Sequence, residues 1–153
     1  APTSPPPGDR MSAPTETPLP RGLRLLGWSG LLPFAAPVAA AALLPEWRQG
    51  ALAVFIAYAA VILSFLGGAR WGRGLGAGLP ASRYAEAVLP SLLGFTALLL
   101  VHRPHAALVV LAIGFTVWLL LDLRDPLWSA AYKRMRLGIS VAVLALHAAW
   151  LAV

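Results

Sequence analysis

The chain alternates between long apolar stretches and short polar connections. After a proline-rich beginning, five stretches contain almost only apolar and small side chains. A helix rises about 1.5 Å per residue, so about 20 residues cross a hydrocarbon core of about 30 Å. The pattern therefore predicts an all-α membrane protein, a five-helix transmembrane bundle with spans at about residues 25–44, 50–69, 85–101, 106–121 and 137–153.

The beginning of the chain differs from the rest in composition. Residues 1–22 hold seven of the 14 prolines and few apolar side chains. Such a segment buries too little apolar surface to offset its loss of conformational entropy. We therefore expect a disordered tail over 1–22 and a membrane domain over 23–153. Met11 is a second candidate for the first residue of the protein.

The first span also has a competing interpretation as a secretory signal peptide. Arg21 and Arg24 precede an apolar run that contains the small residues of 39–41, as in a cleavage site. The run is longer than the core of a signal peptide, and Pro33 and Pro37 interrupt it. We favour a retained span that is kinked where the prolines remove backbone donors.

Composition supports lipid as the solvent of this chain. Its residues are 59% hydrophobic and 12% charged, whereas soluble domains carry about 25% charged residues. The mean hydropathy is +0.74. The net charge of +6 would suggest nucleic acid in a soluble chain, but the positive residues lie between apolar stretches, so we expect no nucleic acid partner. The absence of Cys excludes disulfides and thiolate chemistry.

Lys and Arg gather in alternate connections, which predicts an orientation. Of the 12 basic residues, only Arg48 and Arg103 fall on one side of the predicted bundle. The positive-inside rule makes the other side cytoplasmic, with the N-terminus inside and the C-terminus outside. The basic residues of that side are Arg10, Arg21, Arg24, Arg70, Arg73, Arg83, Arg124, Lys133, Arg134 and Arg136.

Four charged residues lie at similar depth near the predicted cytoplasmic ends of the spans. They are Arg70, Glu86, Asp122 and Arg136. A charge inside a membrane is costly unless it is paired, so we expect them to form an ion-paired polar cluster. One interpretation is a structural interface with side chains that reach toward water. The other is a site for anionic lipid headgroups, since basic pockets between helices suit lipid phosphates.

The second span carries small residues at every fourth position, namely Ala60, Ser64, Gly68 and Gly72. Small residues allow the backbones of two membrane helices to approach closely, so this row is a candidate helix-packing face. A glycine hinge, or backbone that lines a substrate cavity, is the functional alternative.

The glycine run from Gly67 to Gly78, most of which lies in the connection from Arg70 to Tyr84, looks at first like a phosphate-binding loop. It lacks the Lys-Ser or Lys-Thr pair that a P-loop requires, so we expect a mobile cytoplasmic loop and no nucleotide.

His147 is the deepest titratable residue of the predicted bundle. An ionisable residue inside a membrane suggests function, here a proton relay. It lies about 15 Å along its helix from the cytoplasmic end, too far for pairing with Asp122, so a neutral, hydrogen-bonded core His is the simpler interpretation. His102 and His105 flank a turn on the outer side, but a third metal ligand is missing nearby, and we expect no metal and no cofactor.

The stretch Ser64–Gly72, with the sequence SFLGGARWG, resembles the signature of the domain of unknown function 3429 family, which has bacterial members and includes the eukaryotic transmembrane protein 69. Weaker pieces agree in order: GLLPF at 30–34, Pro90-Ser91, Trp118 with Asp122, and YKRMRL at 132–137. The resemblance covers about residues 23–153. It implies an inner-membrane protein of bacteria or mitochondria with about five spans, and it implies no known reaction.

These observations favour a non-enzymatic accessory or scaffold subunit that engages lipid or a larger membrane complex. The chain is short and has no recognisable cofactor motif. A small carrier or channel, including a homo-oligomeric one, is the first alternative, and it requires a polar cavity at the midplane that Ser64 or His147 faces. A lipid-modifying enzyme that uses Asp122 or His147 is the second, and it requires a pocket that brings two titratable groups together.

Overall fold

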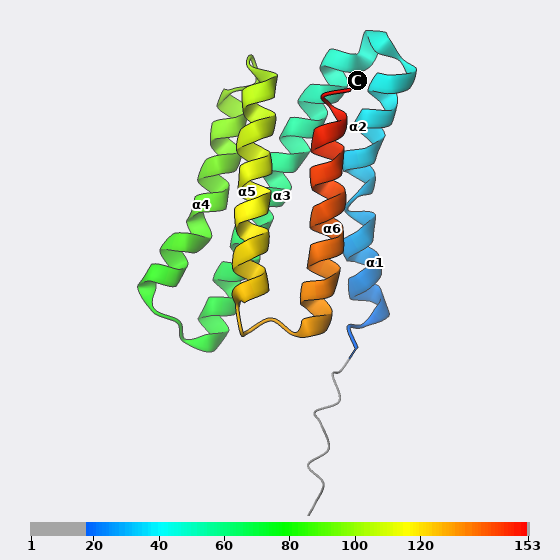
Figure 1. Ribbon diagram of the computed structural model, residues 1–153. Helices are drawn as coiled ribbons and strands as arrows, with labels where there is room; N and C mark the ends of the chain where they lie inside the picture. The colour runs from blue at the N-terminus through cyan, green and yellow to red at the C-terminus, as the bar shows by residue number, and fades with distance from the viewer. Residues whose placement is uncertain (1–17, 153) are drawn as a thin grey trace, which may run out of the picture.

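The computed structural model describes residues 18–152, and over that part of the chain it consists of helices and turns without a strand. Figure 1 shows the long helices running side by side. With α1 and α2 counted as one interrupted rod, the described chain forms five helical rods, as the sequence predicts. The first rod is broken into two helices, and the one-turn helix η1 (Pro45–Trp47) leads into the second rod. The helices are α1 (Arg21–Ser29), α2 (Leu32–Leu43), α3 (Arg48–Ala77), α4 (Ala81–Leu99), α5 (Pro104–Arg124) and α6 (Ala130–Ala149). Most of the expected tail lies outside the described residues.

The surface and length of the rods are those of a membrane protein. Three segments are long and apolar enough to cross a bilayer, namely Arg21–Leu43, Pro45–Ala77 and Pro104–Arg124. Large apolar side chains such as Phe65, Phe95 and Val141 are more than half exposed. Lipid tails solvate such side chains, so an apolar exterior of this kind suits a bilayer rather than water.

The break in the first rod lies just before Pro33. α1 ends at Ser29, and α2 begins at Leu32 after a turn at Gly30 and Leu31. The Gly30 carbonyl, which loses its regular helical donor, accepts a hydrogen bond of 3.1 Å from the Tyr58 hydroxyl of α3. This satisfies the polar backbone inside the bundle. Pro37 stays within α2 and does not end it.

An aromatic cluster fills the core between α2, α3, α5 and α6. Phe34, Phe55 and Phe115 are at most 1% exposed. The ring of Phe34 makes edge-to-face contacts with Phe55 at 5.4 Å and with Phe115 at 6.0 Å between centroids. Such pairs contribute about 0.5–1.5 kcal/mol each beyond the burial of their area. The cluster joins segments that are far apart in the sequence and closes the middle of the bundle.

α3 and α4 form the most intimate helix pair, and its contact row differs from the predicted one. A Cβ on Gly67 would lie 2.3 Å from the Ala87 carbonyl oxygen, and a Cβ on Gly94 would lie 2.8 Å from the Ala60 carbonyl oxygen. By contrast, a Cβ on Gly68 or Gly72 would meet nothing within 4 Å. The predicted face is therefore correct at Ala60, which is buried, and wrong at both of those glycines.

The reason is helical geometry. An α-helix turns about 100° per residue, so a step of four residues advances about 40° around the axis. Three such steps from Ala60 rotate Gly72 by about 120°, off the contact face. A step of seven residues drifts back by only about 20°, which keeps Gly67 and Gly74 in line with Ala60. Ser64 lies at the edge of this row, near Gly94.

The predicted mobile loop from Arg70 to Tyr84 is wrong for most of its length. α3 continues as a helix to Ala77, and only Gly78, Leu79 and Pro80 connect it to α4. Each interior glycine weakens a helix by up to about 1 kcal/mol, and side-chain contacts of Arg70 and Arg73, described below, offset this. Gly78 adopts φ +63° and ends the helix, with its N–H bonded to the Gly74 carbonyl.

α6 begins at Ala130, well before the predicted start at residue 137, because Ser129 caps it. The Ser129 hydroxyl accepts a hydrogen bond of 3.2 Å from the Tyr132 N–H. α5 likewise extends past its predicted end to Arg124. These additional turns carry polar side chains beyond the apolar part of the bundle.

Candidate functional site

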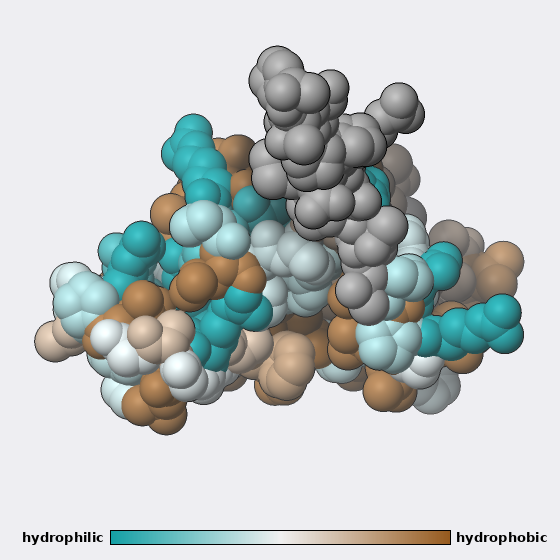
Figure 2. Space-filling model, turned by 90° about the horizontal axis from the view of Figure 1, so that it is seen from below, coloured by the Kyte–Doolittle hydropathy of each residue, from teal (hydrophilic) through white to brown (hydrophobic). Residues whose placement is uncertain are grey.

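One end of the bundle gathers most of the charge. It is the end at which α1 begins and at which the α3–α4 and α5–α6 connections lie, at the bottom of Figure 1. Figure 2 shows this end with hydrophilic side chains spread among apolar ones. Arg48 and Arg103 lie at the opposite end. We call this region the basic end; its basic residues within the described chain are Arg21, Arg24, Arg70, Arg73, Arg83, Arg124, Lys133, Arg134 and Arg136.

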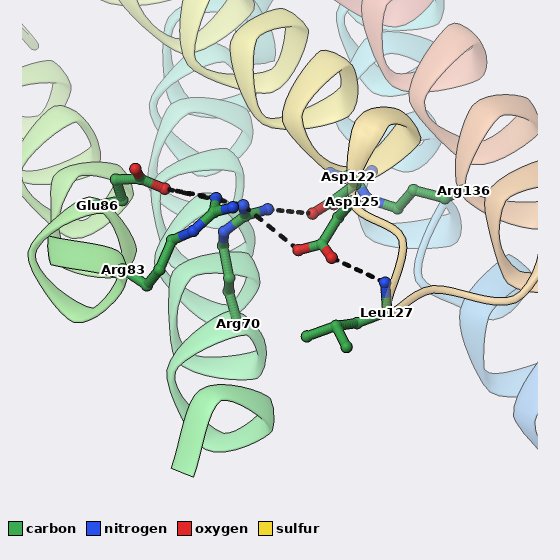
Figure 3. Close-up of polar contacts among 7 residues, drawn as sticks. All are labelled: Arg70, Arg83, Glu86, Asp122, Asp125, Leu127 and Arg136. Carbon is green, nitrogen blue, oxygen red and sulfur yellow. Dashed lines mark hydrogen bonds and ion pairs between the residues drawn. The ribbon is translucent and has the colours of Figure 1, made fainter. Parts of the chain in front are cut away.

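Asp122, on the last turns of α5, lies at the centre of an ion network in the basic end. It is 4% exposed. Its Oδ1 lies 3.2 Å from Nη1 of Arg70, and its Oδ2 accepts a hydrogen bond of 3.0 Å from Nε of Arg136. Both arginines are buried. One carboxylate therefore joins α3 and α6 through α5, as Figure 3 shows.

Arg70 extends this network to further carboxylates. Its Nη2 lies 3.4 Å from Oδ2 of Asp125 and 3.8 Å from Oε2 of Glu86. The same Glu86 oxygen lies 3.3 Å from Nη1 of Arg83. Oδ1 of Asp125 accepts a hydrogen bond of 2.9 Å from the Leu127 N–H (Figure 3). These ion pairs join three guanidinium groups to three carboxylates, so their charges balance. We call this set the charge network, and its members are Arg70, Arg83, Glu86, Asp122, Asp125 and Arg136.

The structure thus brings together all four residues of the predicted polar cluster, and it adds members that the sequence reading missed. Asp125 follows Asp122 by three residues, a spacing that puts both on one side of a helix end. Ser140, four residues after Arg136 on α6, accepts a hydrogen bond from Nη1 of that arginine. Both spacings were visible in the sequence. Arg83 precedes Glu86 by three residues, a spacing that was equally visible.

Beside the charge network, Arg73 lies flat on an aromatic side chain. Its guanidinium carbon is 3.9 Å from the ring centroid of Trp128, and Trp128 stacks on Tyr132 at 4.1 Å. Nε of Arg73 is buried without a hydrogen-bond partner among the described residues. Arg73 lines a small pocket of about 10 Å³, together with Arg70, Arg83, Tyr84, Asp125 and Leu127 among others.

A second, wider hollow lies at the same end. It is an open groove of about 400 Å³ between the beginnings of α1 and α6, with Arg24, Trp28 and Arg134 in its lining. Both hollows are therefore at the level of the basic end rather than in the middle of the bundle.

His147 is packed in the apolar core, far along α6 from the charge network. It is 5% exposed, and its Nδ1 is 2.8 Å from the Val143 carbonyl oxygen of its own helix. The imidazole lies against the rings of Phe55 at 4.8 Å and Phe115 at 5.6 Å. Nε2 is buried and has no partner among the described residues. Neither of the two hollows described above includes His147 in its lining.

Two other expectations concern Ser64 and the outer histidines. The Ser64 hydroxyl donates a hydrogen bond of 2.9 Å to the Ala60 carbonyl of its own helix. Within residues 18–152, His102 and His105 are not joined by a third side chain into a metal-binding group, and no other set of three or more His, Cys, Asp or Glu residues is placed to hold a metal.

Comparison with known proteins gives a family but no activity. The family model described as "Protein of unknown function (DUF3429)" matches residues 19–152. A curated relative, Transmembrane protein 69 of Xenopus tropicalis, is 32% identical over 131 residues, which cover 82% of this chain and 51% of that protein. The chain thus spans about half the length of this relative. No solved structure matches.

Proposed function

We propose that the chain, which belongs to the DUF3429 family of proteins of unknown function, is a non-enzymatic scaffold subunit of the inner membrane of bacteria or mitochondria. By scaffold we mean a subunit that holds a larger membrane complex together and contacts the surrounding lipid. Its N-terminus lies inside and its C-terminus outside, with the basic end at the cytoplasmic or matrix face.

The observation that carries this proposal is the balance of the charge network. The buried arginines, Arg70 and Arg136, both bind Asp122, so that each oxygen of this carboxylate contacts one guanidinium group. General acid–base catalysis needs a titratable group within hydrogen-bond reach of the reacting atom. Asp122 is 4% exposed and already holds two cations, so its arrangement serves to tie helices together.

The middle of the bundle supports the same proposal over the carrier alternative. A carrier binds its substrate near the midplane, on polar groups that line a cavity. Here His147 is enclosed by aromatic rings, and Ser64 bonds to its own backbone. Neither side chain presents a polar group to a passage.

The test is a gene deletion in the organism of origin, followed by native electrophoresis of gently solubilised membranes. Loss of a scaffold shifts a membrane complex to lower mass, and the wild-type gene restores it. His147→Phe keeps the ring and the apolar packing but removes both nitrogens. We expect this variant to restore the complex to at least about 80% of the wild-type amount. The tolerated loss of about 20% allows for a small change in the stability of the variant.

Two results contradict the proposal. If the deletion leaves every membrane complex unchanged in size, the chain is no scaffold. If the stably expressed His147→Phe variant fails to restore the complex, the imidazole acts chemically, and the carrier or enzyme alternative replaces the scaffold.

A further inference from the structure

Arg73 is the one arginine around the small pocket whose charge the neighbouring carboxylates leave unmatched. Within residues 18–152, the three carboxylates of the charge network bind Arg70, Arg83 and Arg136, and no carboxylate lies within ion-pair distance of Arg73. Its guanidinium rests on Trp128 and its Nε has no partner. Arg73 as a whole is only partly buried, so the unmet need is that of this one N–H group, and a buried donor without an acceptor is costly.

The depth of Arg73 indicates where that acceptor comes from. α3 has 30 residues and is therefore about 45 Å long, which exceeds the hydrocarbon core of about 30 Å. If its apolar part ends near Ala69, Arg73 lies about 6 Å further along the axis. The headgroup layer begins at this depth. Trp71 and Tyr84 lie nearby, with their ring centroids 5.1 Å apart. Trp and Tyr side chains are enriched at the membrane–water interface, which agrees with this depth.

The size of the pocket limits what enters it. Its volume of about 10 Å³ admits one water-sized atom. A sugar or a nucleotide does not fit, whereas one oxygen of a phosphate does, with the rest of the group remaining at the mouth. Arg83, whose side chain is 45% exposed, lines the same pocket and can reach a second oxygen of that phosphate.

We infer that this pocket binds a phosphoryl oxygen of an anionic phospholipid, with Arg73 as the primary ligand and Arg83 as the second. Trp128 holds the guanidinium of Arg73 in place by stacking. The charge network supplies the rigid wall of the pocket, since Arg70 and Asp125 line it while they remain paired to each other. This inference rests on the proposed placement of the basic end at the membrane surface.

The test is native mass spectrometry of the purified full chain in mild detergent, titrated with phosphatidylglycerol and, separately, with phosphatidylcholine. Arg73→Gln removes the unmatched charge, and we expect it to weaken the binding of phosphatidylglycerol about fivefold, the usual contribution of one basic residue near the membrane surface. Phosphatidylcholine has the same phosphate group but no net charge, so we expect it to bind more weakly and to lose less than about twofold in affinity on this substitution. Arg103→Gln is the matched control, because Arg103 is exposed and lies at the end of the bundle opposite the pocket. It removes the same charge and should change the affinity for phosphatidylglycerol less than about twofold.

A second variant covers the case in which Arg73→Gln loses its fold. Arg83→Gln removes a half-exposed side chain from the same pocket, and we expect it to weaken phosphatidylglycerol binding about threefold with an unchanged melting temperature. Competition with inorganic phosphate separates the two sources of the anion: at millimolar concentration it should not displace the lipid.

The inference is overturned if neither pocket variant weakens phosphatidylglycerol binding, or if Arg103→Gln weakens it as much as they do, because the lipid then responds to overall charge. Displacement by inorganic phosphate would make a soluble anion the ligand and would also overturn it. The purified chain is tested without partners, so this result is independent of whether the chain organises a membrane complex.

Discussion

At the scale of single residues, Asp122 is the carboxylate of the charge network that pairs with two buried arginines. It compensates two buried guanidinium groups, and the two depend on it unequally. Within the described chain, Arg136 has Asp122 as its only carboxylate, whereas Arg70 also reaches Asp125 and Glu86. Removing one member of a buried ion pair leaves an uncompensated charge, which is much more costly than losing the pair as a whole.

We therefore predict that Asp122→Asn destabilises the chain by about 3–5 kcal/mol and lowers its folded yield, and that Asp122→Lys lowers the yield further. Glu86→Gln is the control, since that carboxylate is 39% exposed and should contribute at most about 1 kcal/mol. Thermal unfolding in mild detergent, read by size-exclusion chromatography, measures both. Equal melting temperatures for Asp122→Asn and the wild type would show that the charge network has no structural role.

At the scale of elements, the pairing of α3 with α4 depends on a row with a seven-residue period. Gly67 lies against the Ala87 backbone, Gly74 lies against the Tyr84 ring, and Ala60 lies against Gly94. In lipid, where burial of apolar side chains from water does not drive helix association, such close contacts supply much of the association energy.

Adjacent glycines of α3 provide a matched test of this row. Gly67→Ala puts a methyl group within 2.3 Å of the Ala87 carbonyl oxygen and should destabilise the bundle by about 1–3 kcal/mol. Gly68→Ala enters open space and should leave the stability unchanged or raise it by up to about 1 kcal/mol, because Ala favours helix. A thermal scan of the two variants in the same detergent compares them, and an equal loss in both would mean that the α3–α4 contact does not depend on Gly67.

Apolar periodicity was sufficient to predict the helical class and the number of rods, and charge position was sufficient to place Arg70, Glu86, Asp122 and Arg136 together. The packing face of α3 could not be read from small residues alone, since Gly67 and Gly68 are chemically identical and only the position of α4 distinguishes them. The helical state of the Arg70–Ala77 segment was also hidden, because its stability comes from tertiary contacts such as Arg73 on Trp128 that local propensity does not contain.

At the scale of the whole molecule, the odd number of rods puts the start of α1 and the end of α6 at opposite ends of the bundle (Figure 1). The basic end coincides with the start of α1. The opposite end has Arg48 and Arg103 as its basic residues within the described chain. From the positive-inside rule, we expect this asymmetry to set the direction in which the chain enters a membrane.

We predict that reporter domains fused to the two termini lie in different compartments, with the N-terminal reporter on the cytoplasmic or matrix side. Protease protection of sealed membrane vesicles measures this directly. As a control, Arg103→Gln should leave the orientation unchanged, because it makes the poorly charged end still less basic. Protection of both reporters, or of neither, would mean that the chain crosses the membrane an even number of times.

The position of Asp122 also has a consequence for the order of synthesis. Arg70 leaves the ribosome 52 residues before Asp122, the most buried of its three carboxylate partners. At a translation rate of about 5–20 residues per second, this interval lasts roughly 3 to 10 s. During this interval, the guanidinium group of Arg70 at the end of α3 lacks its buried partner, and we expect it to stay in the hydrated headgroup layer. Completion of α5 supplies this buried partner, and the later synthesis of α6 brings Arg136 to the same carboxylate.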